Sequence, residues 1–119
     1  MRITIKDFKA PSLNKSYAGR HWSKRKDEAD LIHTLVWAAI NEQKISPITK
    51  FPVDIYVTAY YKYKHRRDGG NVSEKELVDG LVMSKILPDD DTKHIRWSAT
   101  RAIIGAKEDK VIIDIREIL

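Results

Sequence analysis

The stretch that decides the fold runs from residue 53 to residue 63 and reads VDIYVTAYYKY. Apolar side chains occupy every second position over most of its length, namely Val53, Ile55, Val57, Ala59 and Tyr61. This two-residue period is typical of a β-strand, because successive side chains of a strand point to opposite faces of the sheet. We therefore predict a strand here, with one face against the core.

Segments on both sides of this strand have helical periodicity. From Ser23, apolar residues recur at spacings of three and four, and the segment ends before Pro47. The apolar positions are Leu31, Ile32, Leu35, Val36, Ala39 and Ile40. A second helix follows residues 69–70, with a buried stripe of Leu77, Val78, Leu81 and Val82. Ser73 with Glu76, or Asn71 with Glu74, fits a capping box at its start.

Three further segments read as strands. Residues 2–8 alternate, and residues 95–104 and 111–117 flank the polar turn 105–110, as the two arms of a hairpin would. The predicted order is β-α-β-α-β-β, with neither a repeat nor a linker. We expect a single α+β domain over residues 1–119, in which two helices pack on a small mixed β-sheet.

Composition narrows the class of protein. The chain has 22 Lys and Arg against 17 Asp and Glu, a formal net charge of +5, which suits either a polyanionic partner or plain solubility. It contains no cysteine, which excludes a disulfide scaffold, a thiolate zinc site and a cysteine nucleophile. No apolar run is long enough to span a bilayer, and the opening MRITIKDF lacks a signal-peptide core. These features predict a cytoplasmic protein that makes no membrane contact.

Two acidic segments are candidates for metal binding. Asp89, Asp90 and Asp91 follow a proline, and Asp68 precedes a glycine pair. Each has a simpler interpretation. The run of three aspartates is then a solvated loop, and Asp68 is then a turn aspartate. If the strands beside them are neighbours, however, both segments would bracket the second helix at one edge of the sheet. Carboxylates within a basic surface suit metal-dependent phosphodiester cleavage.

Basic and aromatic residues form two clusters. One lies near the first helix and the other before Asp68, where it is interleaved with tyrosines. Such a mixture suits phosphate contact and base stacking, but it also suits an exposed strand end protected by charge. The three tryptophans, Trp22, Trp37 and Trp97, read first as core or interface residues. The histidines have no metal-ligand spacing.

Several of these motifs together resemble the RusA family of Holliday junction resolvases. That family combines Asp-x-Asp-Asn, a helix that carries a lysine and a later aspartate, and a paired-aspartate loop. The matching residues here are Asp68, Asn71, Lys75, Asp79, Asp90 and Asp91. The opening Pro11-Ser12-Leu13-Asn14-Lys15-Ser16-Tyr17 is also similar to the Pro-Ser-x-Asn-x-x-Tyr of that family. The resemblance extends from Pro11 to about Ile95.

This resemblance implies a homodimeric, Mg²⁺- or Mn²⁺-dependent endonuclease that resolves four-way DNA junctions by paired nicks in recombination and repair. Such enzymes are bacterial or prophage-encoded. The implied catalytic residues are Asp68, Asp91 and Lys75, and the implied metal ligands are Asp68, Asp91 and Asp90. The residues assigned to DNA contact are Asn14, Lys15, Tyr17, Arg20, Lys24, Arg25, Arg66, Arg67 and Asn71. Asp79 matches the pattern without a defined role.

One position departs from the family pattern. Gly70 stands where the family has the second aspartate of Asp-x-Asp-Asn, and glycine has no side-chain ligand. Three explanations compete. In the first, Asp89 or Asp90 replaces the missing carboxylate, and in the second, the protein binds junctions without cutting them. In the third, Gly70 is an inactivating change in this chain. A third class of function is a protein-interaction module whose acidic loop is only solvated surface.

Overall fold

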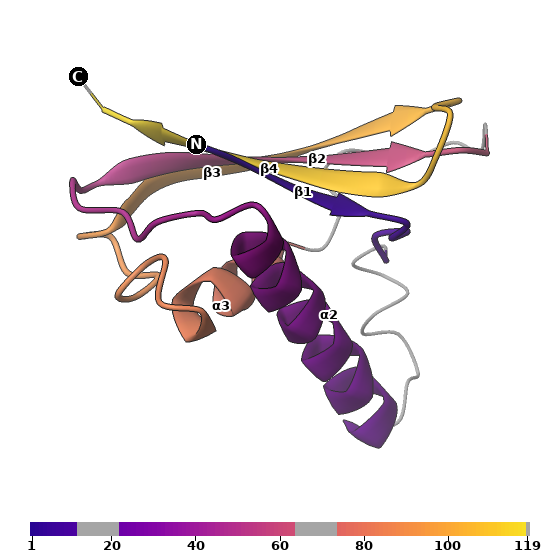
Figure 1. The fold of residues 1–119 in the computed structure, drawn as a ribbon, viewed down its shortest axis with the longest axis horizontal. Coiled ribbons are helices and arrows are strands. Elements are labelled where there is room, and N and C mark those ends of the chain that lie inside the picture. Colours follow the sequence, from indigo (N-terminus) through magenta and orange to yellow (C-terminus); the bar gives the residue numbers. More distant parts are fainter. Residues whose placement is uncertain (12–21, 64–73, 119) are drawn as a thin grey trace.

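The computed structural model describes residues 1–11, 22–63 and 74–118, and the side chains of residues 22–25 are also outside this description. The elements follow the predicted order. They are β1 (Arg2–Lys6), α2 (Trp22–Glu42), β2 (Val53–Tyr61), α3 (Lys75–Met83), β3 (Ile95–Ile104) and β4 (Lys110–Glu117). Both helices lie on the same side of one four-stranded sheet (Figure 1). The predicted α+β class, with a mixed sheet and two helices packed on it, is confirmed.

The sheet has the strand order β1-β4-β2-β3. β4 pairs antiparallel with both β1 and β2, and β3 pairs parallel with β2. The predicted hairpin of the last two strands is therefore wrong, because β2 lies between them. The turn between β3 and β4 crosses the end of β2, where the Ala106 N–H donates to the Tyr61 carbonyl at 3.0 Å. β2 is one of the two inner strands, and it buries side chains on both of its faces, Asp54 and Thr58 included.

The core fills the space between the sheet and the helices. Alternate residues of β1, β2 and β4 enter it from the sheet, as the two-residue period predicted. From α2 it takes Ile32, Val36, Ala39 and Ile40. This stripe is narrower than predicted, because Leu31 points away from it and is 56% exposed. Trp37 and Trp97 are more than half exposed, so their predicted place in the core is wrong, and an interface role stays a prediction.

The two helices meet closely at a glycine. A Cβ atom on Gly80 of α3 would lie 3.0 Å from the Cβ of Val36 on α2, so any side chain here would require the neighbouring helix to shift. The start of α3 differs from the sequence prediction. Glu74 is the N-cap residue and its side chain makes no capping hydrogen bond. The predicted cap residues Asn71 and Ser73 lie outside the described residues. The helix instead gains stability from its buried Leu77, Val78 and Leu81.

Candidate active site

A pocket of about 330 Å³ opens where the start of α3 meets the start of β3. It is lined by Glu74, Lys75, Val78, Asp90, Ile95, Arg96, Trp97 and Ser98. Two residues that the sequence analysis singled out, Lys75 and Asp90, thus share one cavity although they lie on different elements. The pocket is the place in the described structure where predicted site residues from separate segments converge.

The parallel pairing of β2 and β3 explains this convergence. Because the strands run the same way, Val53 pairs with Ile95 at one end and Tyr61 pairs with Ile104 at the other. The end of β2 and the start of β3 are therefore at opposite ends of the sheet, roughly 30 Å apart for strands of this length. The strands are neighbours, as hypothesised, but the prediction that the end of β2 and the acidic run lie at one edge of the sheet is wrong, because the pairing is parallel. Asp90 of the acidic run instead shares the pocket with the start of α3. Asp68 lies outside the described residues.

The three aspartates of the acidic run have different surroundings. Asp89 caps the turn, because its Oδ1 accepts the N–H of Asp90 at 2.8 Å. Asp90 lines the pocket. Asp91 Oδ1 lies 2.5 Å from His94 Nδ1, and this hydrogen bond is the main cause that lowers the pKa of the Asp91 carboxyl. Of the three carboxylates, that of Asp90 belongs to a residue that lines the pocket together with Lys75, and that of Asp91 is held by the hydrogen bond to His94.

The carboxyl of Asp79 is affected by the charges of several neighbouring residues. Asp79 lies one helical turn after Lys75 on α3, and partial burial raises the pKa of its carboxyl. The charges of Asp90 and Glu76 also raise this pKa, whereas Lys75 and His33 lower it. His33 of α2 has both ring nitrogens buried, and the described structure offers neither of them a hydrogen-bond partner. The charges of Lys75, Asp90 and His33 thus all act on the Asp79 carboxyl.

Most of the remaining predicted site residues lie outside the described structure. These are Asn14, Lys15, Tyr17, Arg20, Arg66, Arg67, Asp68, Gly70 and Asn71. Lys24 and Arg25 belong to the first turn of α2, but their side chains are not described either. Their predicted roles in DNA contact and metal binding stay predictions.

Sequence reasoning missed four of the residues that line the pocket. Glu74 was considered only as a capping partner, Arg96 and Ser98 only as part of a strand, and Trp97 as a core or interface residue. The one signal was closeness to the acidic run, since the strand that carries these three residues begins at Ile95, four positions after Asp91. Residues at strand ends beside functional loops deserve inspection for this reason.

Arg96 is held on this rim by an ion pair with Asp54 of β2. A register shift in the β2–β3 pairing leaves Arg96 as an extra residue of β3, between the partners of Val53 and Asp54. Its guanidinium binds the buried Asp54 carboxylate through two hydrogen bonds, of 2.6 and 3.1 Å. These bonds are the main cause that lowers the pKa of Asp54.

Asp54→Asn is expected to destabilise the protein in a pH-dependent way. The folded state favours ionised Asp54, so its contribution is fully present above the ordinary pKa of 3.8 and is lost as the pH falls below that value. Thermal unfolding of the variant should begin several degrees lower at pH 7, and the difference should shrink towards pH 2. Asp27→Asn, on the exposed surface of α2, is the matched control. An equal deficit at both pH values would contradict the ion-pair explanation.

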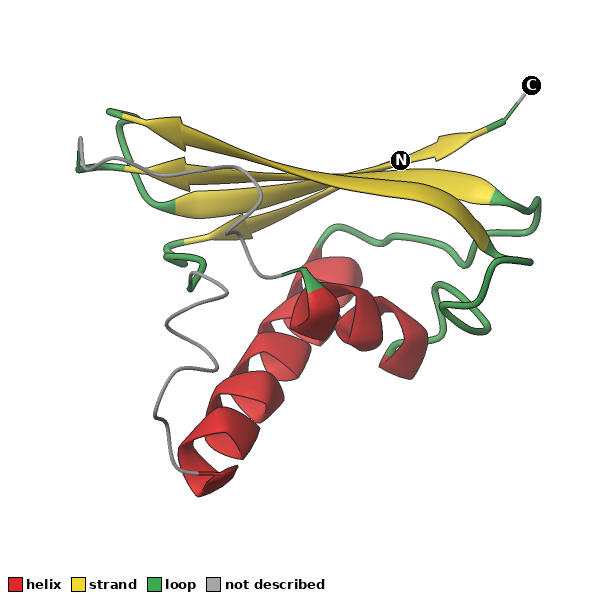
Figure 2. Ribbon diagram, turned by 180° about the vertical axis from the view of Figure 1, so that it is seen from behind, coloured by secondary structure: helices red, strands yellow, loops and turns green. Residues whose placement is uncertain are grey.

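The sheet face opposite the helices is basic and aromatic, and no described helix covers it (Figure 2). We call it the open face. Strand alternation and register assign to it Arg2, Thr4, Lys6, Asp54, Tyr56, Thr58, Tyr60, Trp97, Ala99, Arg101, Ile103, Lys110, Ile112, Asp114 and Arg116. Five of these side chains are cationic and two are anionic. Trp97 also lines the pocket.

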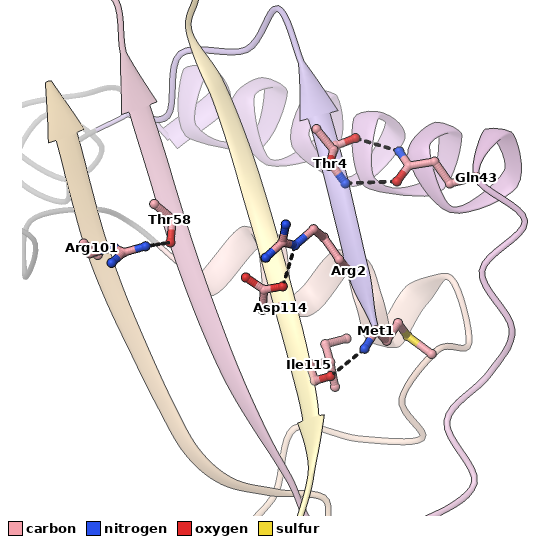
Figure 3. A network of polar contacts seen from close by, with 8 residues as sticks. All are labelled: Met1, Arg2, Thr4, Gln43, Thr58, Arg101, Asp114 and Ile115. Atoms are coloured by element: carbon pink, nitrogen blue, oxygen red, sulfur yellow. Dashed lines mark hydrogen bonds and ion pairs between the residues drawn. The ribbon is translucent and has the colours of Figure 1, made fainter. Parts of the chain in front are cut away.

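Polar contacts arrange the cations of the open face. Arg2 Nε donates a hydrogen bond to Asp114 Oδ1 on the neighbouring strand at 2.8 Å (Figure 3). Arg101 Nη2 donates to the Thr58 hydroxyl oxygen at 3.4 Å (Figure 3). Arg116 and Lys110 each lie 5.0 Å from a ring centroid, over Tyr56 and Tyr60 respectively. These contacts spread positive charge over aromatic rings, an arrangement suited to phosphates and stacked bases.

The donor atoms of the site suit a hard cation. Its acidic ligands would be carboxylate oxygens, the type that Mg²⁺ and Mn²⁺ prefer. Within the described ranges no three histidine, aspartate or glutamate side chains come close enough to form a metal cluster. Mg²⁺ commonly takes only one or two carboxylates and completes its shell with water and substrate phosphate. The residues present therefore fit such an ion.

Comparisons with known proteins add no relative. No protein-family model matches the chain, and no curated protein matches it. Among the described residues, no helix has both the length and the apolar character that crossing a membrane requires.

Proposed function

We propose that this chain is a metal-dependent endonuclease that acts on branched DNA of the four-way junction type. The observation that carries the proposal is the convergence of Lys75 and Asp90 in one pocket, beside the hydrogen-bonded Asp91. A cation and carboxylates in one cavity, on a chain that also carries a basic sheet face, are the parts that phosphodiester hydrolysis needs. The resemblance to the RusA family supports the same reaction.

Each residue has a defined part in the proposed reaction. Asp90 and Asp91, together with Asp68, would hold a Mg²⁺ or Mn²⁺ ion. When bound, such an ion polarises the phosphate and lowers the pKa of a water molecule. The Lys75 ammonium would neutralise the negative charge that develops on the phosphate and on the leaving oxygen. His94 would keep the Asp91 carboxylate oriented through its hydrogen bond.

The open face supplies the DNA-binding half of the proposal. Its excess of cations would contact phosphates, and the predicted contacts from residues 14–25 and 66–71 would add to them. A homodimer would place two such sites for the two opposed strands of a junction, whose two-fold symmetry it would match. The setting would be the cytoplasm of a bacterial cell, where such DNA occurs.

A second candidate is a junction-binding protein that does not cut. Gly70 supplies no carboxylate, and the open face requires no metal to attract DNA. This candidate predicts salt-sensitive junction binding that is the same with Mg²⁺ and with a chelator.

A nicking assay separates the two candidates. A four-way junction is incubated with the chain or with Gly70→Asp, in Mg²⁺, in Mn²⁺ and in a chelator, and binding is measured in parallel against duplex DNA. Symmetric nicks by the unaltered chain in either metal support the endonuclease. Nicks by Gly70→Asp alone favour the junction-binding protein. If neither chain cuts and neither prefers the junction over duplex DNA, both candidates are wrong.

A further inference from the structure

One carboxylate oxygen of Glu74 is buried without a hydrogen-bond partner in the described structure. Glu74 Oε1 accepts a hydrogen bond from the Ser98 hydroxyl at 3.1 Å, so the atom without a partner is Oε2. A buried carboxylate oxygen without a donor is costly, and such orphaned atoms call for a specific explanation, such as a bound ion. Capping is not the explanation, because the Glu74 side chain makes no hydrogen bond to the helix.

With Arg96 paired outside the pocket, the side chains that line it carry more negative charge than their remaining cation balances. Its ionisable lining residues are Glu74, Lys75, Asp90 and Arg96. Arg96 is already paired with Asp54, which leaves two carboxylates opposite one lysine. A divalent cation would satisfy Glu74 Oε2 and balance the second carboxylate that lines the pocket. The pocket has no cysteine or histidine in its lining, so the ion it suits is a hard one.

We propose that Glu74 and Asp90 together hold a divalent cation in this pocket, so that Glu74 supplies the carboxylate that Gly70 does not provide. This inference rests on the metal site of the proposed function and names a ligand for it. Ser98 acts as a positioning residue, because its hydroxyl holds Oε1 and thereby orients the carboxylate. Two carboxylates suffice for Mg²⁺ or Mn²⁺, which keep several water ligands.

Mn²⁺ binding by the full-length chain, without DNA, tests the inference. Free Mn²⁺ is followed by electron paramagnetic resonance for the unaltered chain, Glu74→Gln and Glu76→Gln. Glu74→Gln keeps the shape and an oxygen acceptor for Ser98 but loses the charge, and we expect it to raise the Kd for Mn²⁺ about tenfold or more. Glu76→Gln lies on the same helix turn but outside the pocket lining, and should change the Kd less than about twofold. Unchanged affinity in Glu74→Gln, or an equal loss in both variants, overturns the inference.

A second measurement needs no variant. Mn²⁺ added in small amounts to the unaltered chain should broaden the amide NMR signals of Glu74, Asp90 and Ser98 before those of Glu108 and Lys107 in the β3–β4 turn. Broadening that begins elsewhere overturns the inference. These readouts are independent of cleavage. If Mn²⁺ binds through Glu74 while junctions are neither cut nor preferred, the metal site stands and the endonuclease fails; if junctions are cut and Glu74→Gln binds Mn²⁺ normally, the reverse holds.

Discussion

Lys75→Met is expected to nick a four-way junction at least about a hundredfold more slowly than the unaltered chain. Methionine approximately preserves the length and apolar stem of the side chain but removes the ammonium from the pocket that Asp90 also lines. The loss should fall on the rate of the cleavage step, since that ammonium acts on charge that develops in the transition state. The measurement is a single-turnover nicking assay in saturating Mg²⁺, with junction affinity determined separately.

Lys107→Met is the matched control for this prediction. Lys107 is exposed in the turn between β3 and β4, at the end of β3 away from the pocket. Both variants lose one positive charge, so junction affinity should fall by a similar few-fold factor in each. Only Lys75→Met should lose cleavage. Equal cleavage rates for the two variants would show that the Lys75 charge acts in binding alone.

Gly80→Val is expected to destabilise the fold by about 2–4 kcal/mol, because a side chain at this position collides with the neighbouring helix. The first added carbon would lie 3.0 Å from Val36 Cβ and 3.1 and 3.2 Å from its two γ carbons. The Cβ of Val36 is held by the backbone and cannot rotate away, so the helices must separate. Chemical denaturation gives the free energy of unfolding, and the thermal midpoint should fall by roughly 10 °C.

Two further variants check the cause of this destabilisation. Met83→Val introduces the same residue on the same helix at a position that is 65% exposed, and it should cost less than about 0.5 kcal/mol. Val36→Ala removes the two γ carbons, so the double variant with Gly80→Val should be less destabilised than the sum of the single variants. Additive losses would mean that the two residues do not compete for one space.

The candidate site was only partly predictable. Lys75 and Asp90 stood out because a resemblance and an acidic run singled them out. Glu74, Ser98 and Arg96 carry no such mark, because a glutamate beside a helix start and polar residues in a strand have ordinary explanations. Their role as pocket lining depends on which elements are neighbours. That information is absent from local sequence patterns.

The sequence by itself determined the class, number and order of the elements. Alternation over residues 53–61 and 111–117 and helical spacing within α2 and α3 are local properties, since each reports which side of one element faces an apolar core. Only the tertiary structure decided that β2 lies between β3 and β4, and that β3 runs parallel to it. Strand pairing depends on packing between distant segments, which periodicity does not encode. In this arrangement the start of α3 lies beside the start of β3. The pocket that Glu74, Lys75 and Asp90 line is found there.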